Sequence, residues 1–336
     1  MMENNRPRRA GGLRVLGLGA LLLALAGCTS GTEVPTSQAQ TERELLLVQR
    51  PDATSQALGH AYKDILADAG VSARLAPPAA DPVAEVLAGR ADLAVAGSSD
   101  LLAALGKLPG AQGAADGSAS TPTEGGGAAG PSDAADGPGD LDAATVTKQL
   151  HALKPAGFAV LDTAEAERTG TLVVTAATSA REKLLDIDQL GALCPRLEFG
   201  ISRAARASLV PALATKASCT PKSVAELTDE QARGVMPVIS DAVQVQATTL
   251  ENAGIPDNAL VVLQRAGTLF APQAVTPLIT TDGVGQDAIK AINKLSAALK
   301  QEDLLELNRM VSGRDALEAH KAAADWLADK SLVSAP

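Results

Sequence analysis

The chain has 336 residues and a formal net charge of −10 at pH 7, from 39 acidic and 29 basic side chains. This acidic balance argues against a nucleic-acid partner, because phosphate groups need cationic contacts. Aromatic residues make up only 1% of the chain, so the hydrophobic core must consist mainly of Leu, Val, Ile and Ala.

Residues 1–27 have the pattern of an export signal. Four arginines precede the apolar run 15–26, which is too short for a good membrane span. The run ends in Leu25-Ala26-Gly27-Cys28, which resembles a bacterial lipobox. The resemblance implies cleavage after Gly27 and acylation of the Cys28 thiol, for example with palmitate; the alternative is an ordinary secretory signal with a chance cysteine. We therefore expect a lipoprotein on the extracytoplasmic face of the cell membrane.

Residues 28–44 are polar and lack periodicity, which predicts a flexible tether. Residues 45–105 alternate short apolar runs with amphipathic stretches, a pattern typical of parallel strands connected by helices. Thr54 or Ser55 could cap the first helix, and Gly70 has the place of the glycine that follows a helix. We expect strands at 45–48, 71–75 and 92–96, helices at 54–69 and 82–88, and a further helix after the turn 97–100.

Residues 106–140 are dominated by Gly, Ala, Pro, Ser and Asp. Such a segment cannot bury enough apolar surface to offset its chain entropy, so we predict a disordered insertion in a surface loop. From residue 141 the alternation resumes, and the whole chain is predicted to be of the α/β class. We expect strands at 172–174, 196–199, 260–263 and 275–279, and helices at 181–193, 202–216, 286–310 and 315–327; the alternative for 181–193 is a helix broken near Asp188.

Cys194 and Cys219 are the other two cysteines. Outside the cytoplasm a pair of thiols tends to oxidise, which favours a disulfide over two unpaired buried cysteines. The bridge would close a loop of about 26 residues and stabilise the fold by roughly 3 kcal/mol. No cysteine or histidine spacing suggests a metal, and we expect no cofactor.

A set of segments carries family-like motifs in a fixed order: 47–70, 88–93, 186–190, 197–200 with Arg206 after them, 246–249, 270–278 and 307–308 with 323–332. In this order they resemble motifs of the substrate-binding proteins of glycine betaine, carnitine and choline ABC transporters. The resemblance implies two α/β lobes of the type II binding-protein kind, joined by two crossing strands, with the solute between them and ABC permease subunits as partners. It also implies a first lobe at 45–105 plus 250–336, and a second lobe at 141–249.

The chain departs from this family where the family places the aromatic cage for a quaternary ammonium group. Ala247 stands at the tyrosine of the motif "Y-T-T-D", and Leu250 replaces its aspartate. Gln273 stands at the tyrosine of "F-P-P-Y", and the turn 97–100 replaces one that contains a tyrosine. Cation–π contacts hold such groups, so we expect weak or no binding of betaine, choline or carnitine.

Other side chains could hold a small polar or zwitterionic solute. Ser98 and Ser99 could bind a carboxylate or phosphate at a helix N-terminus, although a capping role is the commoner use of serine there. Arg206 could hold a carboxylate with two parallel hydrogen bonds, or it could be an exposed helix residue. Thr248 and Thr249 could donate hydroxyl groups to the solute, or they could pack in a buried strand.

An enzymatic function has little support in the sequence. The three histidines, His60, His151 and His320, are scattered along the chain. Neither G-x-S-x-G nor a phosphate-binding G-x-x-x-x-G-K-[ST] loop is present. We therefore expect a solute-binding protein of an ABC importer. The alternative is a non-transporting relic of that fold which acts as an envelope sensor or scaffold.

Overall fold

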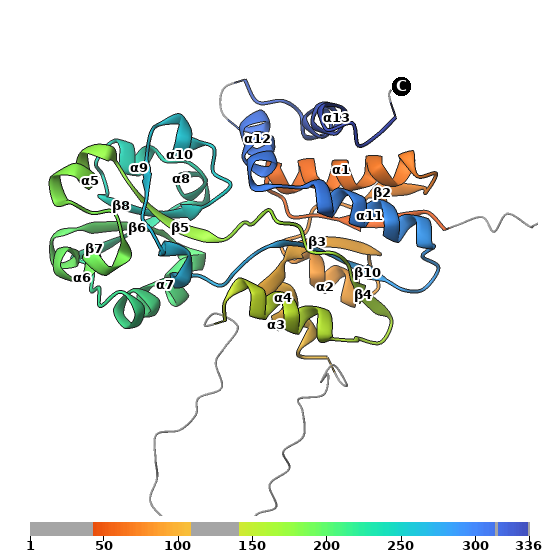
Figure 1. Cartoon of the computed structure of the whole chain (residues 1–336), viewed down its shortest axis with the longest axis horizontal. Helices are drawn as coiled ribbons and strands as arrows, with labels where there is room; N and C mark the ends of the chain where they lie inside the picture. Colours follow the sequence, from red (N-terminus) through yellow and green to blue (C-terminus); the bar gives the residue numbers. More distant parts are fainter. Residues whose placement is uncertain (1–42, 109–140, 313–314, 335–336) are drawn as a thin grey trace, which may run out of the picture. The chain divides into compact units, whose positions relative to one another are not determined.

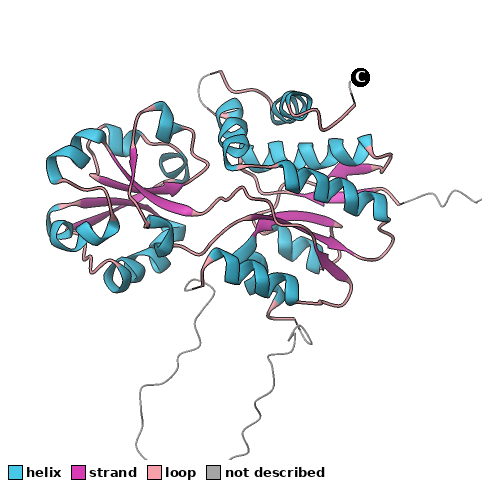
Figure 2. Cartoon of the chain, viewed as in Figure 1, coloured by secondary structure: helices cyan, strands magenta, loops and turns pink. Residues whose placement is uncertain are grey.

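The computed structural model describes residues 43–108, 141–312 and 315–334. These residues form two five-stranded sheets covered by helices, and two stretches of chain run from one sheet to the other (Figure 1; Figure 2). The predicted α/β class is confirmed. The expected signal peptide, residues 28–42 of the tether and residues 109–140 of the insertion lie outside the described residues.

The first sheet has the strand order β2-β1-β3-β10-β4. Strands β1, β2 and β3 are parallel, as the alternation of strands and helices predicts, and Leu47 of β1 pairs with Leu75 of β2 and with Leu93 of β3. Strand β10 is antiparallel to both of its neighbours. The strands are β1 (Leu45–Val48), β2 (Ala73–Leu75), β3 (Leu93–Gly97), β4 (Phe158–Val160) and β10 (Val275–Thr280).

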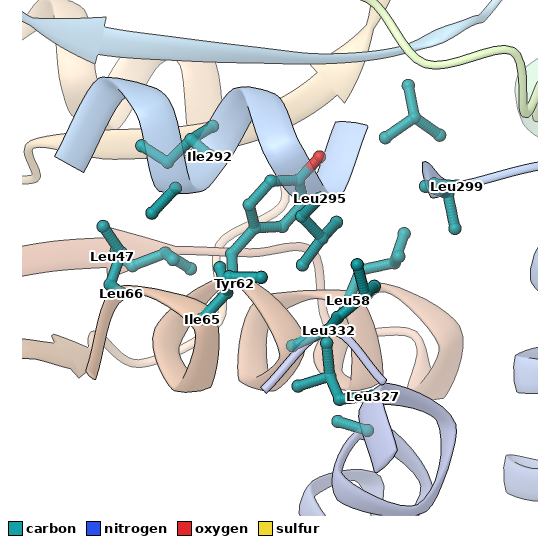
Figure 3. Packing of buried hydrophobic residues seen from close by; sticks show 14 of the residues in the cluster. Leu47, Leu58, Tyr62, Ile65, Leu66, Ile292, Leu295, Leu299, Leu327 and Leu332 are labelled. Carbon is teal, nitrogen blue, oxygen red and sulfur yellow. The ribbon is translucent and has the colours of Figure 1, made fainter. Parts of the chain in front are cut away.

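Four helices pack into the larger core cluster of this sheet, and they lie on the same side of it in Figure 1. Tyr62 points from the first of these helices toward the one that carries Ile292 and Leu295 (Figure 3). Its hydroxyl lies 3.1 Å from the Ser296 hydroxyl, and burial raises the pKa of Tyr62. The helices are α1 (Ala53–Asp68), α11 (Gln286–Ala298), α12 (Gln301–Val311) and α13 (Ala319–Asp329).

Three shorter helices form a second cluster with the first sheet, in which Val86, Leu101 and Leu150 are fully buried. They are α2 (Pro82–Leu87), α3 (Ser98–Leu105) and α4 (Ala143–Ala152). Figure 1 places all three on the side of the sheet opposite α1. The first sheet therefore has an apolar layer on each face, which is the usual arrangement for parallel strands.

The second sheet has the strand order β7-β6-β8-β5-β9. Its strands are β5 (Gly170–Val174), β6 (Glu198–Ser202), β7 (Ser223–Leu227), β8 (Val245–Thr249) and β9 (Val261–Val262). Its helices, 3-10 turns (η) included, are α5 (Ala176–Glu182), η1 (Ile187–Gln189), α6 (Leu190–Leu193), η2 (Cys194–Arg196), α7 (Arg203–Lys216), α8 (Asp229–Arg233), α9 (Met236–Ile239), α10 (Gly254–Asp257) and η3 (Ala266–Leu269). Within the described residues, no helix of either half is long and apolar enough to cross a membrane.

Capping residues set several boundaries differently from the sequence predictions. Asp52, and not Thr54 or Ser55, caps α1, because its carboxylate accepts the Ser55 N–H at 2.9 Å. Gly70 follows this helix at φ +77°, which confirms its expected place. The range 181–193, expected as a helix with a break near Asp188 as the alternative, contains only the end of α5, which stops at Lys183 with φ +56°. The short helical turns η1 and α6 follow it at Ile187–Gln189 and Leu190–Leu193.

The single helix expected at 286–310 is two helices. The backbone is extended at Leu299 and at Lys300, between α11 and α12. The Lys300 N–H donates to the Asp303 carboxylate at 2.9 Å, which starts the second helix. The last helix begins at Ala319, four residues later than the expected Asp315.

The strand pairing also moves the boundaries of the two lobes. Helix α4 and strand β4 lie within 141–249, the range expected for the second lobe, but β4 pairs with β10 of the first sheet. Strand β9 lies in the range expected for the first lobe, but it pairs with β5 of the second sheet. The two connections are therefore residues 161–169 and 270–274, and they bond to each other through Arg168 N and Gln273 O at 2.9 Å.

Cys194 and Cys219 form the predicted disulfide, with their Cα atoms 5.4 Å apart. Both side chains are fully buried in the core of the second half, beside Leu190 and Leu213. The bridge joins the short turns after α5 to the loop that follows α7. It therefore closes a segment that contains η2, β6 and α7.

Candidate functional site

A cavity of about 250 Å³ lies beside the first sheet and the two connections. Its apolar lining includes Leu58, Val83, Val95 and Val275, from α1, α2, β3 and β10. A larger cavity of about 1380 Å³ shares part of this lining and extends to α7, α8 and β8 of the second half. The polar residues common to both cavities are Arg50, Asp100, Arg168, Thr249, Glu251 and Gln273.

Arg168 is the centre of a polar network in this lining. Its Nε donates to Glu251 Oε1 at 3.0 Å, its Nη1 to Ser55 Oγ at 2.5 Å and its Nη2 to Asp52 Oδ1 at 3.0 Å. The hydroxyl of Ser55 donates in turn to Asp52 Oδ2 at 2.8 Å. The Arg168 guanidinium therefore connects the N-terminus of α1 to Glu251, which lies two positions after β8.

The pKa values of this network are set by a competition between burial and charge. Burial disfavours the ionised form of Asp52, but the attraction of Arg168 and the hydrogen bonds from Ser55 outweigh it, so the pKa of Asp52 lies below its ordinary value. Burial likewise opposes the charge on Arg168, but Glu251 and Asp52 outweigh it and raise the pKa of the guanidinium. Asp52 and Arg168 are therefore both charged at neutral pH, and the one guanidinium bonds to the carboxylates of Asp52 and Glu251.

The N-terminus of α3 is occupied by the second connection. Ser98 N donates to Ala274 O at 2.9 Å, and Ser99 N donates to Pro272 O at 3.2 Å. The Ser98 hydroxyl donates to Pro272 O and accepts from Ala274 N. Neither serine lines either cavity, and the capping residue is Gly97. The two N–H groups are thus not available to a carboxylate or phosphate, which corrects the prediction for Ser98 and Ser99.

Gln273 closes the same helix end from the side of the cavity. Its Oε1 accepts from Asp100 N at 3.4 Å, and its Nε2 donates to Asp100 Oδ1 at 2.8 Å. A Cβ atom at Gly97 would lie only 2.0 Å from Gln273 Oε1, so the absence of a side chain there leaves room for the amide. The position that holds a tyrosine in the resembled motif is therefore filled by a side chain that binds the helix start.

The other three predicted site residues differ in their burial and in their position relative to the two cavities. Arg206 is exposed, lies outside both cavities and donates to Val224 O at 3.4 Å, which agrees with the alternative of an exposed helix residue. Thr248 is buried, lines the larger cavity, and accepts from Asn252 Nδ2 at 2.8 Å while it donates to Ala232 O at 3.4 Å. Thr249 lines both cavities. Of the five predicted residues, Thr249 alone lies in the smaller cavity.

One aromatic side chain lies in the larger cavity among the described residues. Phe270, in the second connection, lines that cavity, and a Cβ atom at Gly170 would overlap its ring at 2.2 Å. Tyr62, Phe199 and Trp326 are buried in the cores instead. No described aromatic residue lines the smaller cavity.

Sequence analysis missed the charged residues of the smaller cavity. Asp81 caps α2 by accepting from Ala84 N at 3.0 Å, and the sequence Asp81-Pro82 ahead of an apolar run is a recognisable helix start. Arg168 and Glu251 carry no comparable signal, because neither belongs to a regular element. Arg50 is exposed and has no polar partner among the described residues.

The described structure has two α/β halves, two connections that bond to each other, and a cavity beside them that is partly lined by polar residues. This arrangement defines a two-lobed binding protein of type II fold. Residues 47–329 match the family described as the substrate-binding domain of the ABC-type glycine betaine transport system, OpuAC, and the chain belongs to this family. The family is one of solute-binding proteins. A comparison with curated proteins finds no match.

Solved structures support the same fold at low sequence identity. A glycine betaine/carnitine/choline ABC transporter structure has 14% identity and a TM-score of 0.67, covering 86% of this chain and 99% of that one. Apo YehZ from Escherichia coli has 16% identity and a TM-score of 0.62, with the same coverage. Lactococcal OpuAC, closed and complexed with glycine betaine, has 12% identity and a TM-score of 0.50, covering 86% of this chain and 96% of that one.

Proposed function

We propose that this protein captures a small zwitterionic or polar solute in the cavity beside the two connections and delivers it to ABC permease subunits. The observation that carries the proposal is the charge of the lining. Arg50 offers a cation that has no polar partner among the described residues, whereas Asp81, Asp100 and Glu251 offer carboxylates beside the apolar part of the lining. A solute with separated positive and negative groups matches both kinds of side chain.

The same lining argues against a quaternary ammonium solute. A trimethylammonium group gains about 0.5–2 kcal/mol from each aromatic face that it contacts. The described lining of the smaller cavity is aliphatic, carboxylate, guanidinium, hydroxyl and amide. We therefore expect betaine, choline and carnitine to bind less tightly than a zwitterion of similar size that the polar groups can hydrogen bond.

Solute-dependent stabilisation tests the proposed function. We expect at least one small zwitterion in a thermal-shift screen to raise the melting temperature, because a ligand that binds only the folded state stabilises it. Titration calorimetry on Arg50→Ala should show at least tenfold weaker binding of that solute, since a charge-assisted hydrogen bond contributes about 1.5–3 kcal/mol.

The matched control is Arg74→Ala, which removes an exposed arginine of β2 that lies outside both cavities. It should leave the affinity unchanged. A screen in which no zwitterion or neutral polar solute stabilises the protein would contradict transport and favour a non-transporting sensor or scaffold.

We also propose that the protein is a lipoprotein, held outside the cytoplasm by an acyl chain such as palmitate on Cys28 after cleavage of the signal peptide. The support is the sequence Leu25-Ala26-Gly27-Cys28 behind an apolar run. Cys28→Ala should release the protein from the membrane fraction or leave it unprocessed. Intact-mass analysis that finds no acyl chain on the wild-type protein would refute this proposal.

A further inference from the structure

Glu251 has one carboxylate oxygen without a partner. The residue is 4% exposed and lines both cavities. Its Oε1 accepts from Arg168 Nε at 3.0 Å, but its Oε2 is buried and has no hydrogen-bond partner among the described residues. Both oxygens of Asp52, the other carboxylate on Arg168, accept hydrogen bonds.

An unpaired buried carboxylate oxygen is costly for the free protein. A buried polar atom without a partner costs about 1–3 kcal/mol, and a charged one costs more. The cost is compensated when a bound molecule supplies the missing donor. The surrounding charges point to a cationic donor, because Arg168 is shared by two carboxylates and the network therefore carries an excess negative charge.

We propose that Glu251 Oε2 accepts a hydrogen bond from an N–H of the cationic group of the solute. This proposal rests on the proposed function and names its substrate class: a zwitterion with a primary or secondary ammonium, or with a guanidinium, and not a quaternary one. A quaternary ammonium has no N–H and would leave Oε2 unpaired. Asp100, on the same cavity wall, adds to the attraction for the cation, and Arg50 is available to the anionic end.

A methylation series on the wild-type protein tests this class directly. The probes are glycine, its mono-, di- and trimethylated forms, and the corresponding series on 4-aminobutyrate, each measured by titration calorimetry. In the series that binds, we expect affinity to fall as N–H groups are replaced, with the trimethylated member at least tenfold weaker than the unmethylated one. A trimethylated member that binds as tightly as the unmethylated one, or more tightly, overturns this inference and the expected weak binding of betaine, but leaves the proposed capture of a zwitterion standing.

Failure of the proposed function would give a different set of results from failure of this inference. If no member of either series binds and the wider screen finds no stabilising solute, both proposals are overturned. If neither series binds but the screen finds a solute that lacks an N–H cation, the proposed function stands and this inference is overturned.

The variant Glu251→Gln tests the same hydrogen bond by a change in the protein instead of in the ligand. An amide at this position keeps an oxygen for Arg168 but can turn an N–H toward the cavity, so the unmethylated ligand should bind at least tenfold more weakly. Glu302→Gln, on the exposed face of α12, is the control and should bind like the wild type. Circular dichroism checks that both variants fold. Wild-type affinity in a folded Glu251→Gln protein would overturn the inference.

Discussion

Replacing Arg168 by alanine is expected to lower the free energy of unfolding by about 3–5 kcal/mol, the range for breaking a largely buried ion pair from one side. The arginine side chain is 25% exposed, and its partners Asp52 and Glu251 are 19% and 5% exposed. Without the guanidinium, two carboxylates remain close together and Ser55 loses a donor. Urea unfolding followed by circular dichroism measures the change.

Arg309→Ala is the matched control for this prediction. Arg309 also bonds to two carboxylates, Asp257 and Glu306, but all three side chains are more than 40% exposed, so its loss should cost about 0–1 kcal/mol. Neutralising a carboxylate as well, in Arg168→Ala/Glu251→Gln, should recover part of the stability. An Arg168→Ala protein that unfolds at the wild-type urea concentration would show that the network contributes little.

Removing the disulfide by replacing Cys194 and Cys219 with alanine is expected to destabilise the protein by roughly 3 kcal/mol in the chain-entropy estimate. The bridge spans 25 positions along the chain and lies in the core of the second half. Alanine is chosen because a serine hydroxyl in this apolar core would add an unsatisfied polar group. Urea unfolding of the oxidised wild type and of the double variant gives the difference.

Reduction provides an independent measurement. Dithiothreitol should lower the unfolding midpoint of the wild type toward that of the double variant and leave the variant itself unchanged. Complete alkylation of both thiols in protein taken from the cell envelope, without prior reduction, would show that the bridge does not form there.

The parts of the fold that sequence analysis located correctly have strong local signals. Strand β1 is an apolar run of matching length, and helix α1 has an apolar face and ends before a glycine with positive φ. Strand β4 was missed because three residues pair with β10 far along the chain and carry no periodicity of their own. Lys183 ends α5 in a left-handed conformation, and the sequence of that region does not predict this conformation.

The site was harder to predict than the fold because it depends on tertiary contacts. Ser98 and Ser99 do follow a strand and begin a helix, but residues 272–274 take their hydrogen bonds. Whether a helix N-terminus is free depends on what packs against it, and the local sequence does not contain that information. Arg168 and Glu251 are far apart in the chain, and they come together because Arg168 lies in the first connection and Glu251 lies two positions after β8 of the second sheet.

The two connections between the sheets pair with each other in an antiparallel bridge between Glu167 and Ala274, and Arg168 N donates to Gln273 O. These contacts make a short antiparallel ribbon, so we expect the two connections to move together. The backbone of Arg168 belongs to the ribbon, while its guanidinium fixes one oxygen of Glu251 in the cavity wall. The Arg168 side chain thus links the backbone of the connections to the cavity wall, and we expect a solute that binds Glu251 to restrain the position of Arg168 as well.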